Sequence, residues 1–327
     1  MKALIVKKPL DVYVDEIENP SIEKPSDVII KVEGCGVCGT DFHLYKGLEF
    51  AKYPVIPGHE SVGKVIKLGE FAARFLKEGQ RVVLDPNLPC YVCEACRKGD
   101  IHLCANPVNM GVNLDGAFAE YVKVNYKQCY AISDSVPTEI AALAEPLSCI
   151  LHGLEIAAIQ PWEDALVLGG GPIGLMFFKV MKEVFGIKSV EVVEIDETRM
   201  KLANDIGIHE IYKTPSKSKY DVVIEATGTQ EAFQLGISVL RAKGRIIQFG
   251  VPPENAHGQV PLYEVYKKEL KILGSFTNPY TMSRAVKILE KRGEIFKGIV
   301  TKNINLEELA NLFRKPSKNE LKIMVRF

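Results

Sequence analysis

The chain has 327 residues, of which 47% are hydrophobic and 25% charged, which is typical of a globular protein large enough for two domains. Lys+Arg and Asp+Glu both total 41, so the composition favours neither a nucleic-acid nor an acidic-membrane partner. The opening MKALIVKKPLDVYV holds too short an apolar run for a signal peptide, and no stretch approaches the roughly 18 apolar residues of a membrane span. We therefore expect a cytoplasmic protein whose partner is a small molecule, with no nucleic-acid or membrane partner.

Residues 1 to about 130 predict an all-β region. Short β-branched runs alternate there with Gly, Pro and Asp breaks, namely ALIV (3–6), VIIKV (28–32), SVGKVIKL (61–68), RVVL (81–84) and EYVKV (120–124). From residue 138 the segment TEIAALAEPLSCILHGLEIA predicts a helix that Pro146 interrupts.

Strands and helices then alternate, which predicts βαβ units and a parallel sheet. The expected strands are ALVL (165–168), VEVVE (190–194), DVVIEA (221–226) and RIIQFG (245–250), and helices are expected from Pro172, through RMKLAND and from Gln230. Between EIY (210–212) and DVVIEA only KTPSKSKY remains, which is too short for a crossover helix. We expect a bare loop there that leaves a patch of sheet uncovered. After Gly274 two helices and a last strand, LKIMVRF, are predicted.

The segment VLGGGPIG carries the motif G-x-G-x-x-G between a predicted strand and a predicted helix. Gly169 permits the tight turn, and Gly171 lets a pyrophosphate approach the backbone. The helix that opens at Pro172 offers the free N–H groups of its first turn, at Ile173 and Gly174, to the phosphates. Glu194 follows twenty residues after Gly174, where a carboxylate binds the ribose hydroxyls of NAD. The sequence therefore favours NAD over NADP, although Arg199 could pair with a 2′-phosphate.

Two motifs offer metal ligands. GCGVCGTDFH (34–43) supplies the thiolate of Cys38, and PGHES (57–61) supplies the imidazole of His59 and the carboxylate of Glu60. This mixed donor set suits Zn²⁺. Glu145, in AEPLSC, stands at the junction between the β-rich region and the alternating region.

Four of the eight cysteines crowd into fifteen residues, Cys90, Cys93, Cys96 and Cys104. The spacing C-x2-C-x2-C-x7-C departs from the x3-C-P ending of bacterial ferredoxins. Four thiolates around one tetrahedral zinc leave no open position, so such a site would be structural. We favour structural zinc. The alternatives are a loop that is empty or disulfide-bonded, and an iron–sulfur cluster.

Together these motifs resemble the zinc-dependent medium-chain dehydrogenase/reductase superfamily. CGTD-x-H, PGHE, the four-cysteine lobe, EPLS, GGGPIG, IEATG, RIIQFG and KELKILGSF follow one another in that family's order. The resemblance implies an α/β fold, with a Rossmann doubly wound parallel sheet at 147–273. It also implies a GroES-like β-rich catalytic domain at 1–146 and 274–327, with the cysteine lobe at about 88–106.

The same resemblance implies roles for the site residues. Cys38 and His59 match the catalytic zinc ligands, and Asp41 matches the acid that orients His59. Thr40 and His43 match the proton relay from the substrate hydroxyl to solvent. The pair Glu60 and Glu145 is similar to that of the polyol and threonine dehydrogenases, in which either glutamate can bind the ion.

The expected activity is hydride transfer between a secondary alcohol, with a polyol or sugar favoured, and NAD, with two zinc ions per chain. L-threonine 3-dehydrogenase and a simple secondary-alcohol dehydrogenase are the alternatives. A non-catalytic relative is disfavoured because Cys38, His59, Glu60 and Glu145 are all present, and the cysteine lobe argues against a zinc-free quinone reductase. The resemblance also suggests a homotetramer, with a dimer as the alternative.

Overall fold

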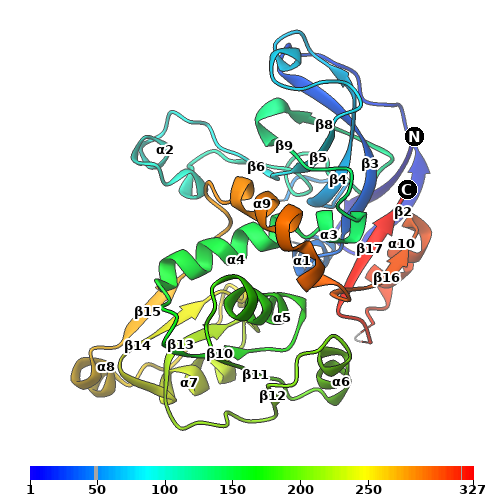
Figure 1. Cartoon of the computed structure of the whole chain (residues 1–327). Coiled ribbons are helices and arrows are strands. Elements are labelled where there is room, and N and C mark those ends of the chain that lie inside the picture. The colour runs from blue at the N-terminus through cyan, green and yellow to red at the C-terminus, as the bar shows by residue number, and fades with distance from the viewer. Residues whose placement is uncertain (48–50, 318) are drawn as a thin grey trace.

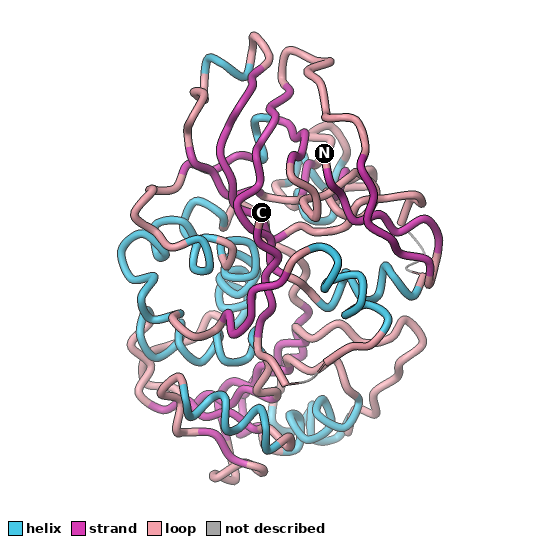
Figure 2. Tube along the Cα trace, turned by 90° about the vertical axis from the view of Figure 1, so that its right-hand side faces the viewer, coloured by secondary structure: helices cyan, strands magenta, loops and turns pink. Residues whose placement is uncertain are grey.

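The computed structural model describes residues 1–47, 51–317 and 319–327, and most of its strands belong to two sheets (Figure 1). A seven-stranded, mainly antiparallel sheet draws on both ends of the chain, and a six-stranded parallel sheet draws on the middle. Helices α4 (Ala144–Ala157) and α9 (Met282–Arg292) pack against each other between the two sheets. Both chain termini lie in the half of the molecule that holds the larger sheet (Figure 2).

The larger sheet has the order β16-β17-β3-β4-β5-β9, and β8 pairs with β3 beside this path. Its strands are β3 (Asp27–Gly36), β4 (Glu60–Leu68), β5 (Arg81–Leu84), β8 (Tyr121–Asn125), β9 (Cys129–Ala131), β16 (Val300–Ile304) and β17 (Lys322–Arg326). Four of the predicted β-branched runs form β3, β4, β5 and β8, because their apolar side chains alternate into one buried core. The fifth run lies in β1 (Lys2–Lys8), which pairs with β2 (Asp11–Glu16) in a separate hairpin.

The C-terminal segment completes this sheet. Strand β17 pairs antiparallel with β3, so that Val325 lies opposite Cys35. Strand β16, which the sequence did not predict, runs parallel to β17. Helix α10 (Leu306–Arg314) packs on the β1–β2 hairpin, and its Phe313 stacks on Tyr45. The last thirty residues are therefore part of the β-rich half.

The prediction that residues 1 to about 130 are all-β is wrong at two short helices. The motif GTDFHLYK forms α1 (Gly39–Lys46), and the cysteine lobe contains α2 (Glu94–Lys98). The lobe is flanked by a small two-stranded ribbon of β6 (Asn87–Leu88) and β7 (Val108–Asn109). Helix α1 begins at Cys38, whose backbone N–H donates to the Asp41 carboxylate three residues on.

The parallel sheet has the order β12-β11-β10-β13-β14-β15, which is the strand order expected of a dinucleotide-binding fold. Its strands are β10 (Asp164–Leu168), β11 (Ser189–Val193), β12 (Ile211–Tyr212), β13 (Tyr220–Glu225), β14 (Leu240–Gln248) and β15 (Lys271–Gly274). The four predicted strands overlap β10, β11, β13 and β14, and the segment EIY overlaps β12. The predicted domain boundaries at 146/147 and 273/274 stay predictions.

Helices cover both faces of this sheet. They are α5 (Pro172–Lys179), which continues as a π-helical turn (Val180–Val184), α6 (Glu197–Asp205), α7 (Gln230–Ser238) and α8 (Leu262–Lys268). Val167 of β10 belongs to the core that α5 and α6 share, whereas its neighbour Leu166 belongs to the core of α7 and α8. The doubly wound arrangement is therefore present.

The crossover from β12 to β13 is a bare loop, as predicted, but it does not leave the sheet uncovered at Glu191. That carboxylate is 6% exposed, and it accepts hydrogen bonds from Ser216 of the loop and from the Tyr220 hydroxyl. Lys217 of the loop also donates to Asp164, at 2.5 Å. Polar side chains thus anchor the loop where a helix would otherwise cover the sheet with apolar ones.

The helix predicted after residue 138 is interrupted, as expected, but the break comes before Pro146 and not at it. Helix α3 (Thr138–Ala141) ends before α4, and Pro146 lies in the first turn of α4, where its missing N–H is not needed. By length and composition alone Thr138–Ala157 could cross a membrane, contrary to our reading of the sequence. However, 78% of its most apolar window is buried inside the protein, as in the core helix of a globular domain.

Candidate active site

The glycine motif forms the turn between β10 and α5 beside a cavity of about 860 Å³. Gly169 has φ +109°, which favours glycine, and a Cβ on Gly174 would lie 1.9 Å from the carbonyl oxygen of Gly169. A Cβ on Gly171 would meet nothing within 4 Å, so its backbone is open to a ligand. The predicted cofactor residues all line the cavity, namely Gly169, Gly171, Pro172, Ile173, Gly174, Glu194 and Arg199.

Glu194 lies at the end of β11 with its carboxylate turned toward the glycine turn. It accepts hydrogen bonds from the backbone N–H groups of Gly170, Ile195 and Asp196, and it is only 6% exposed. Arg199 Nη1 lies 3.6 Å from Glu194 Oε2. This wall of the cavity therefore carries a negative and a positive group side by side. Glu194 could bind the ribose hydroxyls of NAD, and Arg199 could bind the 2′-phosphate of NADP.

Three of the predicted metal ligands converge at the N-terminus of α1. One donor atom from each of Cys38, His59 and Glu60 lies within 4.8 Å of the other two. The three side chains come from a helix start, a loop and a strand start, which the β3–β4 pairing holds together. The donor set of sulfur, imidazole and carboxylate suits zinc.

Asp41 is not one of the three donors, but it lies next to His59. Its carboxylate is 1% exposed, accepts a hydrogen bond from the backbone N–H of Gly58, and lies 3.5 Å from Nδ1 of His59. Burial lowers the pKa of His59, but Asp41 and Cys38 outweigh it and raise the pKa well above its usual value. Because Asp41 lies on the Nδ1 side of the imidazole, Nε2 of His59 is the ring nitrogen left for a cation. The cluster thus has the negative surroundings and a free ring nitrogen that a cation would need.

Glu60 makes a second contact that the sequence did not suggest. Its Oε1 accepts a hydrogen bond of 2.5 Å from Nζ of Lys322, and the two side chains are 1% and 4% exposed. Lys322 lies in β17, 262 residues further along the chain. A Cβ on Gly36 would lie 2.1 Å from Glu60 Oε2, so a glycine is required to admit the carboxylate. Glu60 is therefore shared between a lysine and the donor cluster.

Glu145 lies near the cluster but outside the three-atom group. Burial, and after it the charge of Glu60 opposed by His59, raises the pKa of Glu145 to about 7. Its Oε1 accepts a hydrogen bond of 3.4 Å from the Cys149 thiol, one turn along α4. In this geometry Glu60 is closer to Cys38 and His59 than Glu145 is.

The predicted proton-relay residues lie on α1. Thr40 Oγ1 is 3.8 Å from the Cys38 sulfur, and Thr40 is half-buried, whereas His43 is exposed. Residues three apart on a helix share a face, so the two side chains are placed one after the other between the cluster and solvent. Both belong to a helix where the sequence predicted only strands.

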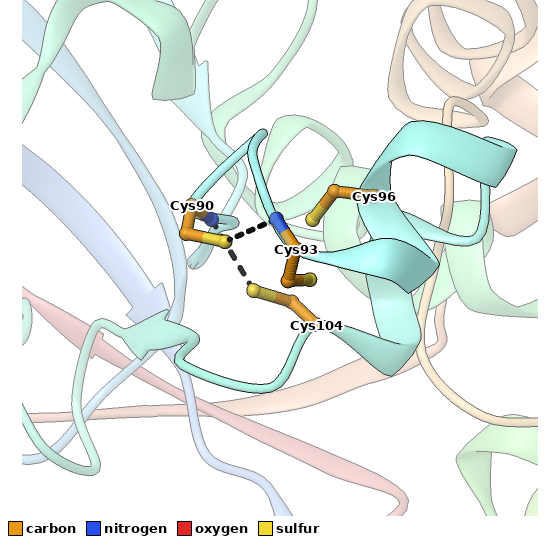
Figure 3. Close-up of side chains that lie close together, drawn as sticks. All are labelled: Cys90, Cys93, Cys96 and Cys104. Carbon is orange, nitrogen blue, oxygen red and sulfur yellow. Dashed lines mark hydrogen bonds between the residues drawn. The ribbon is translucent and has the colours of Figure 1, made fainter.

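The cysteine lobe forms a second cluster, in which four sulfurs lie within 4.8 Å of one another (Figure 3). All four cysteines are free, which disagrees with the disulfide alternative. The backbone N–H of Cys90 donates to the Cys104 sulfur at 3.2 Å, and that of Cys93 donates to the Cys90 sulfur at 3.4 Å. Backbone N–H groups of Ala105 and Cys96 lower the pKa of Cys93 to about 6. Such bonds stabilise thiolates, as a bound metal requires.

Comparison with known proteins agrees with these clusters. Residues 24–134 match the alcohol dehydrogenase GroES-like domain, and residues 172–291 match the zinc-binding dehydrogenase family. The D-altritol 5-dehydrogenase of Agrobacterium fabrum is 34% identical over 93% of this chain and 92% of its own length. The chain belongs to the zinc-dependent medium-chain dehydrogenase/reductase superfamily. The recognition and the fold class predicted from the sequence are therefore confirmed.

Two further members extend the comparison. The D-arabinitol dehydrogenase 1 of Uromyces fabae is 32% identical over all of this chain and 97% of its own length. A solved structure of a zinc-binding dehydrogenase from Sinorhizobium meliloti, bound to NADP, superposes with a TM-score of 0.95 at 30% identity. It covers 100% of this chain and 99% of that one. As a member of this superfamily, the chain is an NAD(P)-dependent zinc oxidoreductase that acts on alcohols.

Zinc and a dinucleotide fit the residues present. The four-sulfur cluster offers the closed donor set of a structural zinc, whereas Cys38, His59 and Glu60 supply three donors, one fewer than the four of a tetrahedral zinc. The cavity along the glycine turn offers an open backbone at Gly171 to a pyrophosphate. Sequence reasoning missed Lys322 because one lysine among the apolar residues of a C-terminal strand gives no sign of its distant partner.

Proposed function

We propose that this protein is a cytoplasmic zinc-dependent polyol dehydrogenase that prefers NAD. The observation that carries the proposal is the convergence of Cys38, His59 and Glu60 in a chain whose parallel sheet forms a dinucleotide cavity. Two relatives that match 93% and 100% of the chain are the D-altritol 5-dehydrogenase and the D-arabinitol dehydrogenase 1, and their names support a polyol over L-threonine or a simple alcohol. The eight free cysteines fit a reducing compartment.

The residues around the cluster have separate tasks. When bound, zinc supplies the Lewis acidity that lowers the pKa of a substrate hydroxyl, and the nicotinamide supplies the hydride acceptor. Cys38 and His59 hold the ion, Glu60 or Glu145 completes the donor set, and Asp41 fixes the imidazole.

Proton release uses a different set of atoms. The Thr40 hydroxyl, beside the Cys38 sulfur, takes the proton of the substrate hydroxyl as it passes its own proton on toward the exposed His43 imidazole, which releases a proton to solvent. The three-residue spacing of Thr40 and His43 on α1 supports this route.

Cofactor preference depends on Glu194. Its carboxylate favours the ribose hydroxyls of NAD and repels a 2′-phosphate, while Arg199 offsets part of that repulsion. Because the Sinorhizobium relative is bound to NADP, both cofactors require a direct test. Removing the charge with Glu194→Gln should raise kcat/KM for NADP relative to NAD.

The exposed edge of the parallel sheet supports a homo-oligomer, either a tetramer or a dimer. Strand β15 ends the sheet with Ile272 exposed, and the neighbouring α8 exposes Leu262, Tyr263 and Tyr266. An apolar patch beside an unpaired strand edge fits the same patch of a second copy. Light scattering after size-exclusion chromatography measures the assembly directly.

The activity test is a substrate panel. Pentitols, hexitols, sugars, L-threonine and 2,3-butanediol are each assayed with NAD and with NADP, together with metal analysis of the purified protein. We expect a polyol with NAD to give the highest kcat/KM and two zinc ions per chain. Highest activity with L-threonine would replace the polyol proposal, and zinc-free protein that oxidises none of these substrates would refute it.

A further inference from the structure

Glu225, the last residue of β13, is a fully buried acid that the catalytic scheme does not use. Its side chain is 0% exposed. Glu194, at the end of β11, has Nη1 of Arg199 3.6 Å away, whereas Glu225 forms no ion pair within the part of the chain that the structure describes. A buried charge without a cationic partner is costly unless hydrogen bonds compensate it.

Four donor groups surround the Glu225 carboxylate. Oε1 accepts hydrogen bonds from the backbone N–H of Thr227, at 2.7 Å, from the hydroxyl of the same residue, and from the backbone N–H of Gly228, at 3.0 Å. Oε2 accepts from Nε2 of Gln248, at 2.6 Å, and shares the N–H of Gly228. Both oxygens therefore act only as acceptors, as those of an ionised carboxylate do. The sheet buries a negative charge at this point.

Glu225 also joins the ends of two neighbouring strands. Gln248 is the last residue of β14 and lies opposite Glu225 in the parallel pairing of β13 with β14. The backbone N–H of Gly250 donates to the carbonyl oxygen of Glu225 at 2.8 Å. A Cβ on Gly228 would lie 2.4 Å from the carbonyl oxygen of Val251, so the loops that follow the two strands are in contact. Glu225 thus fixes two loops at the carboxyl end of the parallel sheet.

The first of these loops is a wall of the dinucleotide cavity. Ala226, Thr227 and Thr229 all line that cavity. A Cβ on Gly169 would lie 2.8 Å from Cγ2 of Thr227, so the loop also contacts the glycine turn. The Glu225 carboxylate is therefore bonded directly to a residue that a bound cofactor would touch.

The topology assigns this wall to the nicotinamide half of the cofactor. The strand order reverses between β10 and β13, and a dinucleotide lies across the sheet at such a point with its pyrophosphate at the glycine turn. Because Glu194 on β11 is the acid expected at the adenosine ribose, the other half extends over β13 and β14. That side also faces α4, which carries Glu145, since a Cβ on Gly153 of α4 would lie 3.2 Å from the ring of Phe249.

We propose that the buried charge of Glu225 shifts the relative affinity of the cofactor site toward NAD⁺ over NADH. The nicotinamide ring carries a positive charge in NAD⁺ and none in NADH, so a nearby carboxylate that is removed from water stabilises only the oxidised form. Glu225 acts through space and needs no contact with the cofactor. The same shift favours release of NADH after an alcohol has been oxidised. The proposal rests on the NAD(P) chemistry of the superfamily and not on the choice of a polyol as substrate.

The test measures the Kd values of NAD⁺ and NADH by isothermal titration calorimetry, with zinc-loaded protein and no alcohol. Glu225→Gln removes the charge and keeps the shape of the side chain, and the Gln248 amide can rotate to accept from the new NH2 group. We expect the ratio of the Kd for NAD⁺ to the Kd for NADH to rise about three- to tenfold. Glu191→Gln removes another buried carboxylate of the same sheet, away from the residues that line the cavity. It is the matched control and should change the ratio less than about 1.5-fold.

Glu225→Asp separates the charge from the shape of the loop. It keeps the charge and shortens the side chain, so both Kd values should rise together and the ratio should stay within about twofold of the wild-type value. A ratio that Glu225→Asp shifts as far as Glu225→Gln does would overturn the proposal. Equal weakening of both cofactor forms by Glu225→Gln, or no change in either, would overturn it too.

A further variant keeps the proposal testable if Glu225→Gln does not fold. Gln248→Lys leaves Glu225 in place and brings a positive charge to its Oε2, so it must raise the same ratio, and an unchanged ratio contradicts the role of the charge. None of these measurements includes a substrate. Their failure therefore leaves the polyol activity standing, and failure of the substrate panel leaves the Glu225 proposal standing.

Discussion

The two donor clusters of this chain are built in opposite ways. Cys90, Cys93, Cys96 and Cys104 come from one fifteen-residue lobe, and backbone N–H groups of the same lobe bond their sulfurs. Cys38, His59 and Glu60 come from three segments, and Glu60 is shared with Lys322 of the last strand. The first cluster needs only local folding and leaves no open position on a tetrahedral ion. The second depends on the packed sheet, and its Glu60 can bind either the ion or Lys322. Local assembly suits a structural metal, and long-range assembly suits a reactive one.

The largest expected effect concerns the second cluster. Cys38→Ser removes the sulfur ligand, so turnover should fall by at least about 10³-fold while the Kd for NAD changes less than about twofold. Steady-state kinetics and a fluorescence titration with NADH measure the two effects, and metal analysis should show one zinc ion lost. Unchanged turnover would contradict the assignment of this cluster as the catalytic site.

Cys93→Ser is the matching change in the lobe. It should also remove one zinc ion, but the loss should appear as stability, with the Tm lowered by roughly 5–10 °C. The folded variant should keep most of its kcat at low temperature. If Cys93→Ser and Cys38→Ser instead reduce turnover equally, with the protein still folded, the distinction between the two clusters is wrong.

Lys322→Met tests whether Glu60 is truly shared. Removing one partner of a buried pair leaves an uncompensated charge, which should cost about 3–5 kcal/mol of unfolding free energy in zinc-free protein. With zinc bound the loss should be smaller, because the cation also neutralises Glu60. Urea unfolding with chelator and with zinc measures the difference, and the double variant Glu60→Gln with Lys322→Met should recover most of the loss. Equal losses under both conditions would place Glu60 outside the reach of the ion.

The smallest expected effect is that of Asp41→Asn. The amide oxygen keeps the hydrogen bond from Gly58, but the NH2 group cannot accept the one from Cys38 and the charge next to His59 is lost, so zinc affinity or kcat/KM should fall by about 10- to 100-fold. Competition with a chromophoric chelator measures the affinity of the more weakly bound zinc. The zinc affinity of the separate cysteine lobe serves as the internal control.

The sequence predicted those parts of the molecule that short-range spacing defines. The turn at Gly169 and Gly174 follows from backbone geometry within six residues, and the four-sulfur lobe follows from its cysteine spacing. The parallel sheet followed from the alternation of strands and helices, and its doubly wound arrangement was implied by the family resemblance.

Other parts depend on contacts that no local pattern encodes. The sequence gives no hint that Lys322 meets Glu60 or that Asn278 meets Asp85, because each pair joins residues about 190 or more positions apart. Helix α1 was missed because GTDFHLYK is short and mixed in composition, and it forms only where Asp41 bonds the backbone of Cys38. The covering of Glu191 by the 213–219 loop was missed for a similar reason, since it depends on side-chain hydrogen bonds.

The position of β17 has a consequence for biosynthesis. Strands β3 and β4 leave the ribosome early, yet Lys322, which neutralises Glu60, follows 262 residues later in β17, the strand that pairs with β3 beside Cys35. A nascent chain therefore carries an unbalanced acid and an open sheet edge until β17 has been made, and it is exposed to aggregation or to capture by a chaperone during that time.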